Sequence, residues 1–569
     1  MQTVKILTVV FPLLLCVSSA NADWARFRGP NGTGVSESEL PVSWTPTQNV
    51  AWKTALPGPG VSSPIVVGDR IFVTCYSGYG LERQNPGDIK DLVRHLVCVD
   101  SKSGKKLWQK DIAATQPEDP YSGIGVVAHG YASHTPVSDG EMVYVFFGKS
   151  GAYAFDLDGK QIWHATIGSE SDPWKWGSSS SPVVHDDLVI VTAAAESQAI
   201  VGLDKKTGKE VWRQEASGLD GMWGTPALVK SASGQTDLVM SVAKEMWGID
   251  PSSGQLRWFC TATGADQTHS SPIAANDTVY AFTGRGGGSV AVTAGGKGDV
   301  TESHVKWNGT DSTRFASPVA HGERLYLVAS GVASVIDADS GKRIKQVRLR
   351  GGSGGGGGRG GGSDYGSPVI AGDKLYYVNG KGEAFVFELG DDLQQLSVNL
   401  VTTDGESFGG TPAISDKRMY LRSDKNLYCV ADSGVEVVAN ASKDLIASVE
   451  EPDAGEGPRG GGRRGPGGGP GGRGGRFDPA AMFKQQDTNN DEKLSKDEVQ
   501  GPMADRFAEI DKDGDEAISL QEFQDGLRSM FRGGGRGGRG GGGGGGRRGG
   551  PGSDNDSRPK RPQRPEMVS

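Results

Sequence analysis

Short runs of β-branched and aromatic residues recur between residues 23 and 450, separated by turn residues. Several runs, such as 65–67, 183–184 and 369–370, directly follow a Ser-Pro or Thr-Pro dipeptide. A turn, often Gly-Asp or Asp-Gly, then leads into a second run, as at 70–74, 142–147 and 374–378. Short apolar runs alternating with turns at this density are typical of an all-β fold.

Two markers divide this region into eight repeats. The Ser/Thr-Pro dipeptide recurs every 44 to 50 residues after a first interval of 72, at Ser63, Thr135, Ser181, Thr225, Ser271, Ser317, Ser367 and Thr411. A second marker, an Asp, then a Gly, then a Trp, falls late in four repeats, with its tryptophan at Trp108, Trp163, Trp212 and Trp258. The glycine suits a tight turn, and the tryptophan offers a large apolar surface to a neighbouring repeat.

A four-stranded repeat of this length is typical of a β-propeller blade. The sequence therefore predicts an eight-bladed propeller over 23–450. Residues 50–53, Val-Ala-Trp-Lys, read as a tryptophan strand with no repeat before them, whereas the eighth repeat lacks such a strand. We expect this N-terminal strand to complete the last blade and close the ring, which removes exposed sheet edges.

The Ser-Pro start and the Asp, Gly-Lys and Trp finish resemble the pyrroloquinoline-quinone (PQQ)-type repeat. That repeat occurs in quinoprotein dehydrogenases and in a non-catalytic outer-membrane assembly lipoprotein. The segments 24–34 and 57–64 are also similar to secreted propeller proteins of planctomycete-like bacteria. The resemblance covers about three quarters of the chain and implies a fold more strongly than an activity.

Residues just before the repeat prolines should surround one mouth of the central channel. The residues that we single out there as a candidate ligand site are His134, Trp176, Trp223, His269, Phe315 and Tyr365. Such aromatic rings above a Ser/Thr collar suit a planar or sugar-like ligand. The alternative is that the rings pack between blades and close the mouth.

The resemblance to dehydrogenases would imply adjacent cysteines beside the quinone, a tryptophan beneath it, a calcium site and an aspartate base. No two cysteines are adjacent in this chain, and the sequence contains neither Gly-x-Ser-x-Gly nor a phosphate loop. No catalytic residue is identified. The alternative function, a PQQ- and calcium-dependent alcohol or sugar dehydrogenase, is therefore not favoured, although His129, His134 and His269 remain candidate acid–base groups.

Residues 1–22 carry one early lysine, an apolar run and an Ala-Asn-Ala end, which predicts a secretory signal peptide cleaved before Asp23. An uncleaved anchor and lipidation at Cys16 are the alternatives. No later segment is long and apolar enough to span a membrane, so we expect an exported, periplasmic or cell-surface protein. Cys75 and Cys98 either form a disulfide or remain buried thiols.

Residues 477–531 carry the clearest metal-binding pattern, an EF-hand pair. Positions 1, 3, 5, 7 and 12 of the two twelve-residue loops are Asp487, Asn489, Asp491, Lys493 and Glu498, and then Asp511, Asp513, Asp515, Ala517 and Glu522. These oxygen ligands suit calcium, with position 7 acting through its backbone carbonyl. Leu494 and Ile518, at position 8, are expected to pair the two loops.

Both loops depart from the pattern at position 6, where Glu492 and Glu516 replace glycine. A non-glycine residue in the left-handed conformation costs roughly 1–2 kcal/mol. We therefore predict weak calcium sites, suited to millimolar extracellular calcium.

The remaining segments are rich in Gly and Arg, over 451–476 as a linker and 532–569 as a tail, and are predicted to be disordered. Their net charge is +8 whereas that of 477–530 is −8, within a chain of 569 residues and net charge −9. These segments have two alternative roles. They contact an envelope protein, an anionic polysaccharide or the acidic loops, or they serve as a simple solvated tether. Arg-Gly repeats also bind RNA, but the signal peptide argues against a nucleic-acid partner.

Together these features predict an exported, monomeric calcium-binding protein whose propeller serves as a non-catalytic binding or scaffold domain. Its partner is not identified by the sequence.

Overall fold

The computed structural model describes residues 24–121, 126–284, 287–352, 365–432, parts of 483–524, and 563–568. The chain divides into two compact units, one formed by residues 1–448 with 559–569 and the other by residues 449–558. The predicted leader 1–22, the linker 451–476 and most of the tail 532–569 lie outside the described residues.

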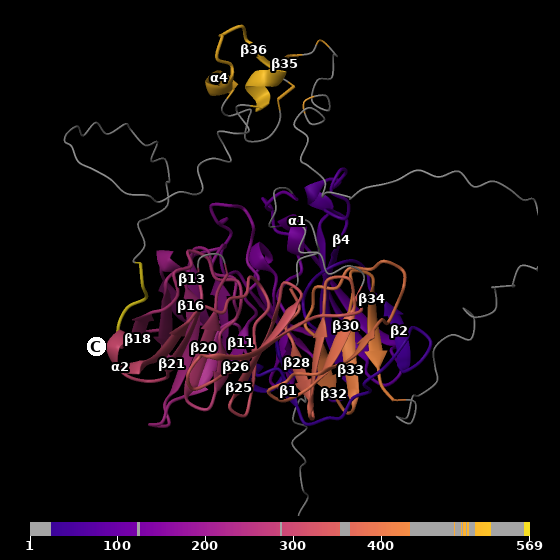
Figure 1. Ribbon diagram of the computed structural model, residues 1–569, viewed down its shortest axis with the longest axis vertical. Coiled ribbons are helices and arrows are strands. Elements are labelled where there is room, and N and C mark those ends of the chain that lie inside the picture. Colours follow the sequence, from indigo (N-terminus) through magenta and orange to yellow (C-terminus); the bar gives the residue numbers. More distant parts are fainter. Residues whose placement is uncertain are drawn as a thin grey trace, which may run out of the picture. The chain divides into compact units, whose positions relative to one another are not determined.

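The first unit is an eight-bladed β-propeller (Figure 1). Consecutive strands pair antiparallel within each blade, which confirms the all-β prediction. Blade 1 consists of β3 (Ile65–Val67), β4 (Arg70–Ser77), β5 (Val93–Asp100) and β6 (Lys106–Ala113), and blade 2 of β7 (Val137–Ser138), β8 (Met142–Phe146), β9 (Ala152–Asp156) and β10 (Gln161–Ala165). Blade 3 consists of β11 (Val183–His185), β12 (Leu188–Ala193), β13 (Ala199–Asp204) and β14 (Glu210–Glu215), and blade 4 of β15 (Ala227–Lys230), β16 (Thr236–Val242), β17 (Glu245–Ile249) and β18 (Leu256–Thr261).

The other four blades follow the same order. Blade 5 consists of β19 (Ile273–Ala275), β20 (Thr278–Phe282), β21 (Ser289–Thr293) and β23 (Val305–Gly309), and blade 6 of β24 (Val319–His321), β25 (Arg324–Ala329), β26 (Val332–Asp337) and β27 (Arg343–Arg348). Blade 7 consists of β28 (Val369–Ala371), β29 (Lys374–Val378), β30 (Ala384–Glu388) and β31 (Gln395–Asn399). Blade 8 consists of β32 (Ala413–Ser415), β33 (Arg418–Arg422) and β34 (Asn426–Val430), completed by β2 (Val50–Ala55).

Strand β2 pairs antiparallel with β34, so the N-terminal strand completes blade 8 and closes the ring as predicted. Two short strands add to other blades in parallel. Strand β1 (Val35–Ser36) pairs with β28, and β22 (Gly298–Asp299) pairs with β18.

The serines and threonines of the eight repeat markers form a closed belt of hydrogen bonds. In each repeat, the backbone N–H of this residue donates to the side-chain hydroxyl of the corresponding residue in the next repeat, over 2.8–3.0 Å. The eighth bond, from Thr411 N–H to Ser63 Oγ, returns to the first repeat. The belt explains why a hydroxyl residue recurs here, since each oxygen satisfies a buried N–H of its neighbour.

Tryptophans of the outermost strands join adjacent blades. Trp52 Nε1 donates to the carbonyl of Ser101 in blade 1, and Trp108, Trp163 and Trp307 make equivalent bonds to the blade that follows each of them. The indole of Trp52 also covers Gly104, where an added Cβ would lie 2.6 Å from the ring. The predicted contact with the following repeat is thus observed for Trp108 and Trp163, and Trp212 likewise covers Gly254 of blade 4, whereas Trp258 Nε1 donates to Asp237 within its own blade.

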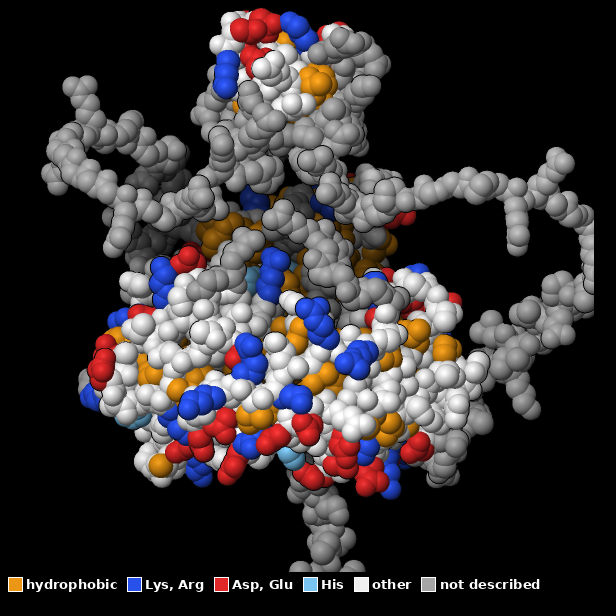
Figure 2. All heavy atoms as spheres, in the orientation of Figure 1, with side chains coloured by type: hydrophobic (Ala, Val, Ile, Leu, Met, Phe, Trp, Pro, Cys, Tyr) orange, Lys and Arg blue, Asp and Glu red, His pale blue; other side chains and the backbone are white. Residues whose placement is uncertain are grey.

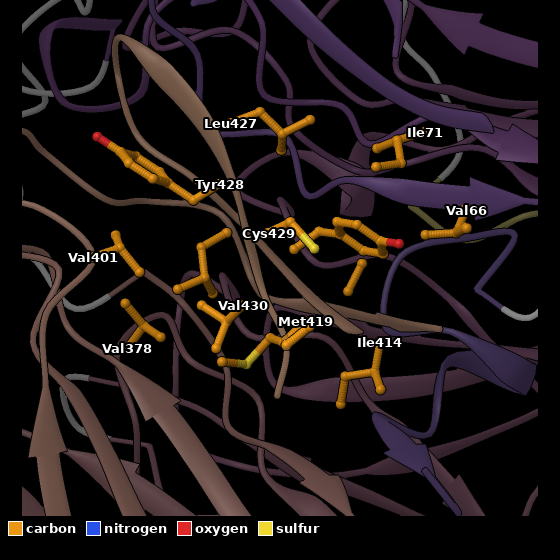
Figure 3. Packing of buried hydrophobic residues seen from close by; sticks show 14 of the residues in the cluster. Val66, Ile71, Val378, Val401, Ile414, Met419, Leu427, Tyr428, Cys429 and Val430 are labelled. Carbon is orange, nitrogen blue, oxygen red and sulfur yellow. The ribbon is translucent and has the colours of Figure 1, made fainter. Parts of the chain in front are cut away.

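The apolar core consists of clusters shared between neighbouring blades. The largest crosses the closure point and draws on blades 7, 8 and 1, with Val378, Met419 and Ile71 as members (Figure 3). The four described cysteines, Cys75, Cys98, Cys260 and Cys429, are buried free thiols.

Helices in the first unit are short, namely α1 (Val126–His129), α2 (Thr301–His304) and the 3-10 turns η1 (Pro30–Gly32), η2 (Ile89–Asp91), η3 (Gly148–Ser150) and η4 (Ser217–Leu219). Among the described residues, no helix is long and apolar enough to cross a membrane. Acidic side chains gather along the lower rim in Figure 2, where the labels β25, β28 and β32 of Figure 1 stand.

In the second unit, β35 (Lys493–Ser495) and β36 (Ala517–Ser519) form a two-stranded antiparallel sheet, and α4 (Phe507–Ile510) lies between them in the chain. Leu494 stands opposite Ile518, which confirms the predicted pairing at this position. Both side chains are fully buried in a small core with Phe483, Phe507 and Phe523.

Candidate ligand site on the propeller axis

A cavity of about 360 Å³ opens on the propeller axis. Seven of the eight belt residues line it, all except Thr225, so the belt forms its collar. A hydroxyl group has one proton and two lone pairs. Because each belt oxygen accepts one backbone N–H, its own O–H remains to donate into the cavity.

Aromatic rings form a continuous arc above this collar. Trp176 lies 5.5 Å from Trp223, Trp223 stacks on His269 at 4.7 Å and 9°, His269 meets Phe315 edge-on at 5.2 Å, and Phe315 lies 4.4 Å from Tyr365, measured between ring centroids. All five line the cavity. The repeat geometry produces the arc, because Trp223, His269, Phe315 and Tyr365 each stand three or fewer residues before a belt position.

Arg314 is the charged side chain of the cavity lining. Its guanidinium lies 4.8 Å from the centre of the Phe315 ring, and no ion pair joins it to a carboxylate within the described part of the chain. Burial and the charge of Arg314 lower the pKa of His269 to about 4, so this ring is neutral at pH 7. Burial also lowers the pKa of His129, whose Nε2 donates to the Trp176 carbonyl at 2.8 Å. The described lining of the cavity therefore carries one positive charge, that of Arg314.

The described lining contains no Asp, Glu, Asn or Gln. Calcium in proteins is held by carboxylate and carbonyl oxygens. The aromatic arc and Arg314 suit the ring and acid groups of a quinone such as PQQ, but the side chains present do not fit the calcium that the dehydrogenase resemblance implies.

A second, smaller cavity of about 30 Å³ adjoins the first and shares His129, Ser133 and Trp176 with it. Two buried ion pairs line it, Arg94 with Glu118 at 2.5 Å and Lys149 with Asp119 at 3.2 Å. A space of this size holds about one water molecule.

His134 lines this second cavity rather than the axial one. Its Nε2 lies 3.0 Å from Ser178 Oγ, which donates at 2.5 Å to Oε1 of Glu196. Glu196 Oε2 is buried and has no hydrogen-bond partner among the described residues. Burial raises the pKa of Glu196 to about 7 and, together with the charge of Arg94, lowers that of His134 to about 3.

Sequence reasoning did not identify Arg314 or Glu196. Each had a visible signal, since Arg314 precedes a predicted channel aromatic and Glu196 is an isolated acid after three alanines that follow an apolar run. No signal in the sequence indicated that Glu196 lies beside Ser178 and His134, because the three belong to different repeats.

The second unit holds the described part of the predicted calcium loops. Carboxylate oxygens of Asp511, Asp513 and Glu522 lie within 4.8 Å of one another. Asp515 instead pairs with Lys493, and Glu516 adopts the predicted left-handed backbone with φ of 63°. Of the first loop, Asp491, Lys493 and Glu498 are described, whereas Asp487, Asn489 and Glu492 lie outside the described residues.

The glutamates at position 12 are held alike in both loops. Glu498 accepts from the N–H and hydroxyl of Ser495, and Glu522 accepts from the same groups of Ser519, over 2.7–3.0 Å. Ala517 N–H donates to Asp515, leaving the Ala517 carbonyl as the group expected at position 7. Carboxylate oxygens of this kind are the ligands that calcium takes in proteins.

Known proteins resemble this chain across the propeller. The relatives include the outer membrane protein assembly factor BamB of Burkholderia pseudomallei (strain K96243), 26% identical over 26% of this chain and 29% of the relative. They also include a tetrathionate hydrolase of Acidithiobacillus ferrooxidans, 23% identical over 42% and 49%, and a polyvinylalcohol dehydrogenase of Pseudomonas sp., 24% identical over 43% and 35%. The chain thus spans less than half the length of each.

Among solved structures, BamB of Moraxella catarrhalis matches with 12% identity and a TM-score of 0.45, over 68% of this chain and 99% of that one. A europium-containing methanol dehydrogenase matches with 14% identity and a TM-score of 0.35, over 70% and 89%. The family model described as outer membrane protein assembly factor BamB matches residues 93–347 and 227–438, which together make up more than half of the chain. This chain is therefore a member of the BamB family of PQQ-like propeller proteins.

Proposed function

We propose that this protein is an exported, non-catalytic binding protein that holds a planar or sugar-like ligand with an acidic group in its axial cavity and calcium in its second unit. The observation that carries the proposal is the aromatic arc beside Arg314, which forms no ion pair with any described residue, over a collar of hydroxyl groups. Rings of Trp223 and His269 favour a flat apolar face. Arg314 and the hydroxyls favour a carboxylate or similar acid group.

A ligand titration followed by tryptophan fluorescence tests this proposal. The probes are an aromatic carboxylate and a uronic acid, each beside its neutral amide or neutral sugar. Of the two pairs, at least one acid should bind tenfold or more tightly than its neutral counterpart, because a charge-assisted hydrogen bond contributes roughly 1.5–3 kcal/mol. Arg314→Gln should remove this preference, and Trp223→Ala should weaken both members of the pair several-fold.

Arg324→Gln is the matched control, because Arg324 pairs with Asp391 outside the cavity lining. The proposal is wrong if no probe binds saturably, or if Arg314→Gln and Arg324→Gln reduce binding equally.

The competing function is a quinone- and calcium-dependent dehydrogenase. The polyvinylalcohol dehydrogenase relative and the fit of an aromatic acid to the arc favour it. The described lining speaks against it, because it offers no carboxylate as a base or calcium ligand. Incubation with PQQ and calcium, followed by dye reduction with alcohols and sugars, separates the two: turnover that Trp223→Ala abolishes would establish the enzyme.

Calcium binding is proposed for the EF-hand pair in 477–531. It rests on the two matched loops and on the convergence of Asp511, Asp513 and Glu522. Because Glu516 occupies the left-handed position, at a cost of roughly 1–2 kcal/mol, we propose weak sites in the millimolar range.

We further propose export by the leader 1–22 and an envelope location, where the partner is an envelope protein or polysaccharide. The leader sequence and the assembly-factor name of one relative support this.

A further inference from the structure

A segment that follows the second unit in the chain returns to the propeller. Residues 563–568 belong to the first unit and lie beside β18 and α2 (Figure 1). The N–H of Leu256 donates to the carbonyl of Glu566 at 2.7 Å, and the N–H of Val568 donates to the carbonyl of Leu256 at 2.9 Å. Met567 thus stands beside Leu256 as a parallel strand residue.

The segment covers an otherwise open part of the blade 4 edge. Strand β22 already pairs with Trp258 and Phe259 of β18. Leu256, at the start of β18, is covered by the segment instead and is fully buried. An extended peptide that adds to a sheet edge through main-chain bonds is a common mode of peptide recognition.

Arg564 gives the contact its side-chain specificity. Its guanidinium binds both carboxylate oxygens of Glu245, one of them at 2.8 Å, and its Cζ lies 3.6 Å from the centre of the Phe259 ring. Trp247 Nε1 donates to the same carboxylate and holds it in place. A two-pronged carboxylate contact combined with ring stacking is selective for arginine over lysine. Pro565, the next residue, is buried.

Blade 3 forms the other wall of this groove. The N–H of Gly218 donates to the carbonyl of Gln563 at 2.9 Å, and Gln214 Oε1 accepts from the N–H of Glu566 at 3.3 Å. A Cβ at Gly218 would lie 2.5 Å from that Gln563 oxygen, so the close approach requires glycine.

We propose that this groove between blades 3 and 4 is a peptide-binding site, and that its ligand is segment 563–568 of the same chain. The eight blades, the hydroxyl belt and the tryptophan contacts are complete without the segment, which makes it a ligand of the propeller rather than a part of the ring. Since the ligand is covalently attached, its effective concentration favours binding within one chain over binding between chains.

A fluorescent peptide of residues 563–569 tests the proposal by anisotropy. It should bind saturably to a chain that lacks residues 563–569 and at least tenfold more weakly to the full chain, whose groove is occupied. A peptide with Arg564→Ala should bind the shortened chain at least tenfold more weakly, as should one with Arg564→Lys, and added salt should weaken the parent peptide. A peptide with Gln563→Ala is the matched control, because Gln563 contributes only its backbone carbonyl to the contacts above.

Absence of binding to the shortened chain, or equal binding to both chains, would overturn the proposal. Hydrogen exchange in the full chain provides a second measurement that does not depend on the truncation. Arg564→Ala should accelerate exchange at the amide of Leu256 at least tenfold, while the amide of Val97 in blade 1 should not change. Unaltered exchange at Leu256 would equally contradict the proposal.

Discussion

At the scale of single residues, Glu196 is the most unusual group in the propeller. Its side chain is buried, one oxygen accepts a hydrogen bond from Ser178, and the other has no partner in the part of the chain that the structure describes. Burial disfavours the charged form, which raises the pKa from 4.5 to about 7 in the folded protein. The folded state therefore binds more protons than the unfolded chain between these two pH values.

This shift predicts a pH-dependent loss of stability. The contribution of Glu196 to the free energy of unfolding is fully present below pH 4.5 and is lost as the pH rises through about 7. Its size is roughly 3 kcal/mol, at 1.36 kcal/mol per pKa unit. Melting curves at pH 5 and pH 8 measure it. Because the lowered pKa values of His134 and His269 act in the opposite direction over this range, the test compares variants: the change in Tm from pH 5 to pH 8 should be more favourable in Glu196→Gln than in the wild type.

Two comparisons secure this assignment. Glu323→Gln, in an exposed turn, should show the same change in Tm as the wild type. His134 has the opposite sign, because its pKa is lowered to about 3 and its contribution is lost as the pH falls below 6.5. An equal change in Tm between pH 5 and pH 8 in the wild type and Glu196→Gln would show that the carboxyl is not buried as described.

At the scale of elements, the contact between a tryptophan and the turn glycine of the next blade joins the repeats. Gly104 has φ of 72° and its position is covered by Trp52. Gly104→Ala should therefore suffer both backbone strain, roughly 1–2 kcal/mol, and overpacking, roughly 1–3 kcal/mol. Gly68 is a matched control, since it has φ of 55° and no atom within 4 Å of an added Cβ.

Chemical denaturation should show a larger loss of stability for Gly104→Ala than for Gly68→Ala, by roughly 1–3 kcal/mol. Equal losses would mean that the tryptophan moves aside at little cost, and that this contact does not join the blades.

These elements also show what could be predicted from the sequence. Repeat markers recur at fixed positions, so their period predicted the blades, the closing strand β2 and the proximity of Trp223, His269, Phe315 and Tyr365. Trp307 was missed as a joining residue because β22 and α2 are inserted where its Asp and Gly marker would stand. Contacts between dissimilar segments, such as Arg564 with Glu245, have no period and could not be predicted.

At the scale of the whole molecule, the protein combines two units with different sources of stability. The propeller depends on apolar clusters and the belt, whereas the second unit has only a small apolar core beside carboxylates whose like charges repel one another. Calcium at several millimolar should therefore raise the melting temperature of the second unit, by mass action, and leave that of the propeller unchanged.

Differential scanning calorimetry with and without calcium measures this effect in the full chain. Glu522→Gln should weaken it, because Glu522 supplies oxygens to the cluster. Glu383→Gln, within blade 7, is the control and should leave the calcium effect unchanged. The calcium assignment fails if the wild type and Glu522→Gln respond alike, or if neither responds at ~10 mM, about tenfold above the 10⁻³ M limit of weak sites.

The belt bond from Thr411 to Ser63 joins residues 348 apart, and β2 must await β34 before it gains a partner. During synthesis, β2 therefore cannot join its blade until β34 has emerged, which requires almost the entire propeller. During that interval, the strand that ends at Ala55 and the outer edge of each new blade stay open to other chains. Pairing over such long separations is slow. We therefore expect the open sheet edges of this protein to need protection from other chains for longer than those of a propeller whose ring closes within one repeat.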